Sequence, residues 1–363
     1  MRTIKAAICR DFNAPLSVED VRLRPPGPGE VEVALEAVAI CHSDIHYAEG
    51  AWGGALPAVY GHEAAGRVTA VGPCVTGWAE GQPVIVTLMR SCGACATCAS
   101  GAPVYCRDVP DLPPPLTTLD GGALKQGLAC GAFAERVVVH PSQLAAVPDD
   151  MPAEQACLLA CGVVTGLGAA VHSAAVRPGE VVVVIGAGGV GLNAIQGARL
   201  AGAARIIAVD MTEDKLAAAR EFGATDGVLA TDPKPWRAAR AAAGGRAADA
   251  VLVTVGAIPA YDAAQRYLAP RGRLVMVGMP HSGEKAAYEP VVVAAQGQAL
   301  VGSMMGEVVL PRDIPWMVDL WRQGRLELAG LISGRWSLDH INEAFADTKA
   351  GHARRNVILL QPS

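Results

Sequence analysis

The sequence predicts an α/β protein of two domains, one rich in β-strands and one built on a doubly wound parallel sheet. The length of 363 residues favours two domains over one. Up to about residue 160, short alternating segments are broken by Gly and Pro. From residue 179, near-continuous Val/Ile runs alternate with Ala-rich stretches, which is typical of strands buried on both faces between helices.

The first region is expected to supply half-buried strands, because apolar and polar residues alternate within each segment. A Pro/Gly turn at PPGPGE precedes them. The expected strands are EVEVALEAVAI (30–40), GRVTAVG (66–72), QPVIVTL (82–88) and FAERVVVH (133–140).

The second region is expected to alternate strands with helices, and the tail adds two helices and a strand. Gly351 is placed to stop the last helix. The final strand, NVILL, resembles the first region, so the chain is expected to return to the first domain. The expected strands are 179–186, 205–210, 249–256, 271–278 and 356–360, and the helices are one ending near 201, 213–223, 258–269, 313–324 and 337–351.

Charge and hydropathy exclude several partners. The net charge of −5 leaves no basic excess for a phosphate backbone, so nucleic acid is not expected to bind. The opening MRTIKAAICRDF lacks the apolar core of a secretory signal, and the longest apolar stretch, 156–171, is shorter than a membrane span. We therefore expect a cytoplasmic protein without membrane contact, whose ten cysteines are ligands or buried thiols more often than disulfides.

A glycine fingerprint marks a nucleotide site. Gly186, Gly188 and Gly191 form G-x-G-x-x-G between a strand and a helix, and Asp210 ends the next strand. The glycines let the backbone approach a pyrophosphate at the helix N-terminus, which predicts a Rossmann domain. The Asp210 carboxylate is expected to bind a ribose hydroxyl and to repel a 2′-phosphate, which favours NAD over NADP; Met211 offers that phosphate no cation.

Four cysteines fall in one short loop. Cys92, Cys95, Cys98 and Cys106 have the spacing C-x2-C-x2-C-x7-C. Four thiolates suit tetrahedral zinc, with an iron–sulfur cluster as the alternative. Because such a zinc site has no open position, we expect it to fix the loop rather than to react. A nucleic-acid zinc finger is disfavoured because the loop lacks Lys and Arg clusters.

Further metal-ligand residues are scattered along the chain. Cys41 lies in AICHSDIH, His62 and Glu63 lie in GHEAAG, and Cys161 lies in LLACGVVTG. Each fragment alone is weak, because a cysteine beside a histidine can equally be a nucleophile or a buried thiol. Their order is more specific: CHSDIH, GHEAAG, the four-cysteine loop, CGVVTG and the glycine fingerprint follow one another.

This motif set resembles the zinc-dependent alcohol dehydrogenases of the medium-chain dehydrogenase/reductase superfamily, from about residue 4 to 360. The resemblance implies a GroES-like, β-rich catalytic domain over 1–162 and 299–363, and a Rossmann NAD-binding domain over 163–298. It implies a homodimer or homotetramer. It also implies two zinc ions per chain, one structural and one catalytic.

The resemblance assigns the catalytic zinc to Cys41, His62 and Cys161, with one position left open; this is the alcohol dehydrogenase ligand set that also serves as a standard example of a catalytic zinc. Glu63 matches an occasional ligand. Asp44 matches the acid that hydrogen-bonds the ligand histidine and fixes its tautomer.

The resemblance also assigns proton transfer and cofactor contacts. Ser43 is expected to take the alcohol proton, and His46 to end the relay through the nicotinamide ribose. His42 stands where many family members carry an arginine against the pyrophosphate. The implied cofactor contacts are His42, Thr165 at the nicotinamide, Gly186, Gly188, Gly189, Val190, Gly191, Asp210, Lys215 at the adenosine ribose, Val277, and Arg355 at the pyrophosphate.

The expected reaction is reversible hydride transfer between a primary or secondary alcohol and NAD, giving an aldehyde or ketone. Two alternatives stay open: a formaldehyde dehydrogenase that needs a thiol carrier, and a non-catalytic NAD-binding protein. No acid and arginine pair for a thiol carrier is evident near Trp52 and Pro110. Residues that line either an apolar pocket or the core are Trp52, Leu88, Met279, Met304 and Met305.

Overall fold

The computed structural model describes residues 1–360, which divide into two compact units. The first combines Met1–Cys161 with the chain from Val309 onward, and the second is Gly162–Val308. The predicted boundary at 298/299 is therefore corrected to 308/309, because strand β16 (Ala299–Gly302) pairs in parallel with β15 (Leu268–Met276) and so belongs to the second unit. The other boundary lies one residue before the predicted one.

The first unit contains a closed five-stranded barrel and a second sheet. The barrel order is β1-β2-β7-β8-β4, and the sheet order is β10-β6-β5-β3-β18-β17, with β9 also paired to β3. These strands are β1 Arg2–Cys9, β2 Ser17–Leu23, β3 Val31–Ala39, β4 Ala58–Val59, β5 Glu63–Val71, β6 Pro83–Thr87, β7 Leu116–Thr118, β8 Ala123–Gln126, β9 Arg136–Val139, β10 Leu144–Ala146, β17 Ile332–Ser337 and β18 Arg355–Leu359.

The tail returns to the first unit, as the sequence predicts. Strand β18 pairs antiparallel with β3 through Val357↔Ala39 and parallel with β17. Gly351, with φ 74°, ends α11 in the left-handed region that favours glycine. The α-helices of this unit are α1 His42–Ala48, α2 Ala96–Ala99, α3 Ala153–Ala156, α10 Leu310–Arg322 and α11 Ile341–Ala350.

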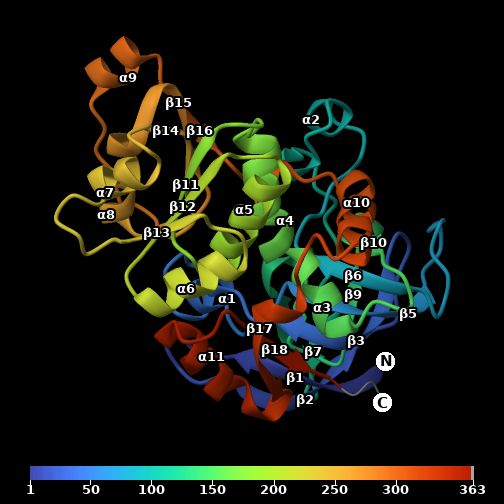
Figure 1. The fold of residues 1–363 in the computed structure, drawn as a ribbon. Coiled ribbons are helices and arrows are strands. Elements are labelled where there is room, and N and C mark those ends of the chain that lie inside the picture. Colours follow the sequence, from blue (N-terminus) through green and yellow to red (C-terminus); the bar gives the residue numbers. More distant parts are fainter. Residues whose placement is uncertain (361–363) are drawn as a thin grey trace. The chain divides into compact units, whose positions relative to one another are not determined.

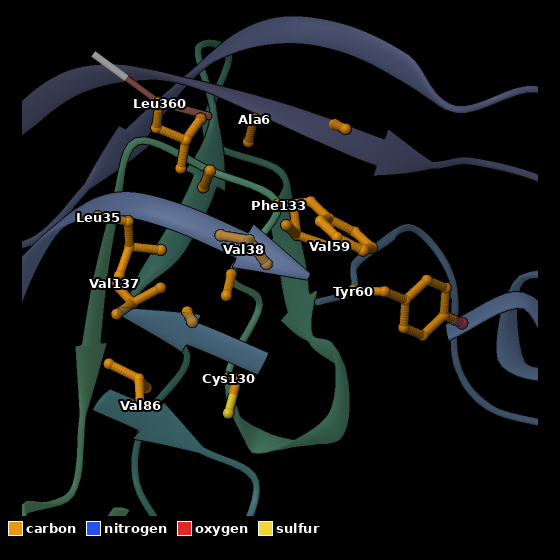
Figure 2. Packing of buried hydrophobic residues seen from close by; sticks show 14 of the residues in the cluster. Ala6, Leu35, Val38, Val59, Tyr60, Val86, Cys130, Phe133, Val137 and Leu360 are labelled. Atoms are coloured by element: carbon orange, nitrogen blue, oxygen red, sulfur yellow. The ribbon is translucent and has the colours of Figure 1, made fainter. Parts of the chain in front are cut away.

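The core of the first unit decides which strand residues face inward. Val86 of β6 and Val38 of β3 lie in one hydrophobic cluster with Phe133 (Figure 2). Because successive strand residues point to opposite faces, the neighbours of Val86 on β6, Ile85 and Thr87, lie on the other face of the sheet. Nearly every residue of β3, β6 and β9 is buried, so these strands are covered on both faces and the prediction that they are half-buried is wrong for them.

The second unit is a six-stranded, all-parallel sheet in the order β13-β12-β11-β14-β15-β16. Helices cover both of its faces (Figure 1), which confirms the doubly wound fold class. Its remaining strands are β11 Val181–Ile185, β12 Arg205–Asp210, β13 Asp226–Leu229 and β14 Ala248–Val253. Its α-helices are α4 Gly162–Gly168, α5 Gly189–Leu200, α6 Glu213–Glu221, α7 Pro235–Ala242, α8 Ile258–Ala264 and α9 Pro290–Gln296.

Membrane-spanning potential is limited. Among residues 1–360, no single helix has the length and apolar content needed to cross a membrane. One pair of consecutive helical segments, Ala153–Ala160 and Gly162–Ser173, meets the length and composition test only when the two are taken together.

Candidate metal and nucleotide sites

The buried carboxylate of Asp44 joins the start of α1 to the start of β5. One of its oxygens accepts hydrogen bonds from the backbone N–H of Gly61 at 3.0 Å and from His62 Nδ1 at 2.9 Å. The other accepts from the Cys41 backbone N–H at 3.1 Å. Gly61 has φ +90°, and a Cβ there would lie 2.6 Å from the backbone nitrogen of Phe133, so this turn requires glycine.

Four ligand-type side chains converge beside this carboxylate. The ligand atoms of Cys41, His62, Glu63 and Cys161 all lie within 4.8 Å of one another, and all four residues are buried. Because Nδ1 of His62 faces Asp44, its Nε2 is the atom left for the cluster, and this buried nitrogen has no hydrogen-bond partner among the described residues. Two thiols and an unpartnered imidazole nitrogen fit a tetrahedral metal ion with an open position.

The two thiols of the cluster are not equivalent. The hydrogen bond with Cys161 holds the pKa of the Cys41 thiol well below its usual range, and the same contact raises the pKa of Cys161. The thiolate is the form that binds a metal, so a thiolate at Cys41 suits this donor set.

Glu63 is held by a buried arginine. Arg355 Nη1 lies 3.2 Å from Glu63 Oε1 and also donates to the carbonyl oxygen of Ile40 at 3.2 Å. Burial raises the pKa of Glu63 to about 8, although the Arg355 charge opposes this shift. The contacts seen for Arg355 therefore belong to the carboxylate of the cluster, whereas its predicted contact with a pyrophosphate stays a prediction.

The four-cysteine loop gathers its sulfur atoms as predicted. The Sγ atoms of Cys92, Cys95, Cys98 and Cys106 lie within 4.8 Å of one another, and Cys92–Cys98 and Cys95–Cys106 are 4.0 and 3.9 Å apart. Four thiolates about 2.3 Å from one zinc ion lie about 3.8 Å apart, which matches these separations. A cluster with several iron atoms would hold its cysteines farther apart, so a single ion fits better.

The glycine fingerprint forms the turn from β11 into α5. Gly186 has φ +98°, and a Cβ at Gly191 would lie 1.7 Å from the backbone oxygen of Gly186, so close packing requires both glycines. A Cβ at Gly188 would meet nothing within 4 Å. Gly188 is the N-cap of α5 and has no side chain with which to cap it. Open space beside the first N–H groups of a helix is what a pyrophosphate needs.

Asp210 ends β12 and faces the same turn. Its carboxylate accepts from the Ala187 backbone N–H at 2.6 Å and from the Met211 backbone N–H at 2.7 Å. Lys215 Nζ lies 3.9 Å from the same carboxylate. A carboxylate can accept about four hydrogen bonds, so capacity remains for a ribose hydroxyl.

The other predicted cofactor residues are placed with the second unit. Thr165 on α4 is nearly buried, and its hydroxyl lies 3.6 Å from Met305 Sδ. Val277 is buried directly after β15, and Gly189 and Val190 open α5. None of these contacts tests their predicted cofactor roles.

The remaining α1 residues are near the metal cluster in sequence. His42 is exposed, Ser43 and His46 are half-buried, and the ring of His46 lies 5.0 Å from the ring of Trp52. Leu88 packs against the hydrophobic core of the first unit. Leu88 is half-buried, Met305 is buried and Met279 is 48% exposed, and whether any of them lines a substrate pocket stays a prediction.

Two features escaped the sequence analysis. Met305, Gly306 and Glu307 all have left-handed backbones, with φ 49°, 64° and 56°. They form the turn whose Met305 side chain contacts the Thr165 hydroxyl. Thr87 is buried at the end of β6, on the sheet face opposite that of Val86, and its hydroxyl forms no hydrogen bond with the described residues. A polar residue at the end of an otherwise apolar strand was the available signal for Thr87.

Comparisons with known proteins cover nearly the whole chain. The family model described as "Alcohol dehydrogenase GroES-like domain" matches residues 27–149, and "Zinc-binding dehydrogenase" matches residues 189–323. An NDMA-dependent alcohol dehydrogenase from Amycolatopsis methanolica is 32% identical over 98% of both chains. An S-(hydroxymethyl)glutathione dehydrogenase from Paracoccus denitrificans is 33% identical over 99% of this chain and 100% of its own.

Among solved structures, an alcohol dehydrogenase zinc-binding domain protein from Burkholderia ambifaria is 35% identical and covers 99% of both chains, with a TM-score of 0.95. The relatives found by sequence and the solved structure therefore all match this chain over at least 98% of its length.

Proposed function

This chain belongs to the zinc-dependent alcohol dehydrogenases of the medium-chain dehydrogenase/reductase superfamily, and on that premise we propose that it transfers a hydride reversibly between a primary or secondary alcohol and NAD. The observation that carries the proposal is the buried convergence of Cys41, His62 and Cys161, with an unpartnered imidazole nitrogen among them.

In this proposal the catalytic zinc is held by Cys41, His62 and Cys161. When bound, zinc lowers the pKa of an alcohol hydroxyl and polarises a carbonyl oxygen. Asp44 accepts the Nδ1 proton of His62, which fixes the tautomer that presents Nε2 as a ligand. Glu63 stays in its ion pair with Arg355, so three protein ligands leave one position for substrate.

The chain supplies the proton path and the cofactor cradle. Oxidation of the alcohol releases a hydride, which NAD accepts, and a proton, which Ser43 passes toward His46. The two residues are three apart on α1 and therefore share a helix face. Gly188 leaves room for the pyrophosphate, and Asp210 binds the ribose and disfavours a 2′-phosphate.

The four-cysteine loop, in the same proposal, holds a second, structural zinc. Its sulfur separations support a single tetrahedral ion. A homodimer or homotetramer stays a prediction, to be measured by light scattering.

The experiment combines metal content with NAD reduction over a panel of alcohols, each with and without glutathione. Two zinc ions per chain and NADH formation without thiol support the alcohol dehydrogenase. One zinc and no turnover would refute it and favour a non-catalytic NAD-binding protein.

Formaldehyde oxidation with a thiol carrier is the second candidate, because a relative of nearly equal length is an S-(hydroxymethyl)glutathione dehydrogenase. It predicts that formaldehyde is oxidised only when glutathione or another low-molecular-weight thiol is present. Formaldehyde turnover that ignores added thiol would exclude it.

A further inference from the structure

A buried threonine lies beside the carboxylate of the metal cluster. Thr87 is directly opposite Glu63 in the antiparallel pairing of β5 with β6. Directly opposed residues share one face of a sheet, with Cβ atoms about 4.5–5.5 Å apart. The next pair, Ala64↔Val86, belongs to the hydrophobic core of the first unit, so Thr87 and Glu63 lie on the opposite face, where the cluster forms.

Both side chains lack hydrogen-bond partners. Thr87 Oγ1 and both carboxylate oxygens of Glu63 are buried and form no hydrogen bond with any residue that the structure describes. The carboxylate has its ion pair with Arg355, on one side only. An unsatisfied buried hydroxyl is unfavourable, and a buried water commonly supplies the missing bonds where two or more polar groups converge.

We propose that Thr87 is a positioning residue for Glu63. Its hydroxyl donates to one buried water, and that water donates to the Glu63 carboxylate. The bridge holds the carboxylate in its ion pair with Arg355 and keeps it from taking the open metal position that the substrate needs. The inference rests on the proposed function, because only a metal ion at Cys41, His62 and Cys161 gives Glu63 an alternative partner to Arg355.

A crystallographic test examines the zinc-containing native chain, Thr87→Val and Thr87→Ser. Valine keeps the shape and removes the hydroxyl, whereas serine keeps the hydroxyl. A water about 2.7–3.2 Å from both Oγ and a Glu63 oxygen is expected in the native and serine chains. In the valine chain the water should be lost and Glu63 should turn toward the metal. A native structure without this water would overturn the proposal.

A spectroscopic test uses the chain with cobalt(II) in the Cys41–His62–Cys161 site. The visible cobalt bands should change in Thr87→Val, because Glu63 becomes an added ligand, and should stay native in Thr87→Ser. Thr69→Val is the matched control: its hydroxyl bonds Glu32 at 2.8 Å on β3, and its loss should leave the bands unchanged.

The outcomes separate the two proposals. A native chain that shows no cobalt bands from the Cys41–His62–Cys161 site refutes that metal site and with it the proposed function. A native chain with normal bands that Thr87→Val leaves unaltered refutes the role of Thr87 alone. If the serine and valine variants show the same altered spectrum, the hydroxyl is not the cause, and the proposed role of Thr87 is refuted as well.

Discussion

Alanine at Gly191 and alanine at Gly188 should impair the second unit in different ways. A Cβ at Gly191 would lie 1.7 Å from the backbone oxygen of Gly186 and 2.9 Å from Thr254 Oγ1. Real Cβ atoms essentially never come within 3.0 Å of such neighbours, so the backbone of the turn must move by more than about 1 Å. A Cβ at Gly188 meets nothing within 4 Å.

The cost at Gly191 follows from this overlap. Overpacking a well-packed site costs about 1–3 kcal/mol, and each kcal/mol lowers Tm by about 2–4 °C in a domain of about 150–250 residues. We therefore expect Gly191→Ala to melt roughly 2–12 °C below the native chain. Cofactor affinity should fall as well, because the displaced turn carries the phosphate cradle.

Gly188→Ala should keep the fold. Its φ of −78° and ψ of −172° lie in the extended region that alanine adopts freely. The added methyl group, however, occupies the space beside the N-terminus of α5 that a pyrophosphate would use. We expect an unchanged Tm and NADH binding weakened at least about tenfold, or about 1.4 kcal/mol.

The assay pairs thermal unfolding with titration of NADH fluorescence, for both variants and the native chain. Melting of Gly191→Ala at the native temperature would refute the steric argument. Native NADH affinity in Gly188→Ala would refute the cradle. Equal loss of stability in both variants would mean that a Cβ at Gly188 also meets neighbouring atoms, and would refute the open space inferred there.

Three further changes test the first unit. Asp44→Asn removes the charged acceptor of the His62 Nδ1 proton and should weaken metal binding about 10–100-fold in competition with a chromogenic chelator; native affinity would contradict this. Cys98→Ser should lower the zinc content by one ion per chain in mass spectrometry, whereas two retained ions would exclude the four-sulfur site. Arg355→Gln removes the counter-ion of the buried Glu63 carboxylate. Above the Glu63 pKa of about 8 this should cost about 3–5 kcal/mol in urea unfolding, and less at lower pH, where Glu63 takes up a proton. Adding Glu63→Gln should recover part of the loss, and unchanged unfolding at the higher pH would disprove the ion pair.

Much of the candidate site could be predicted from local spacing. The four cysteines of the loop span only 92–106, so their pattern survives any arrangement of the rest of the chain. The glycine fingerprint is equally local, because one turn between a strand and a helix contains it. For Cys41, His62 and Cys161, spacing was not enough, and the order of motifs in a known family supplied their grouping.

Other features required long-range contacts. The ion pair of Arg355 with Glu63 joins residues almost 300 positions apart, and the sequence resemblance assigned Arg355 to a phosphate instead. The boundary at 308/309 depends on the pairing of β16 with β15. Because β16 is short and mostly exposed, its sequence does not show the apolar pattern that would predict a strand there. The left-handed Met305 was also beyond prediction, because non-glycine residues rarely adopt that conformation.

By itself, the sequence determined the fold class, the metal-ligand residue types and the nucleotide turn, because periodicity, ligand chemistry and glycine geometry act within a few residues. Only the tertiary structure decided which side chains share a face. Thr87 faces Glu63 because of the register of β5 against β6, and a shift of one residue would turn it toward the hydrophobic core of the first unit. Register is fixed by the packing of the whole core, and no local pattern around Thr87 contains that information.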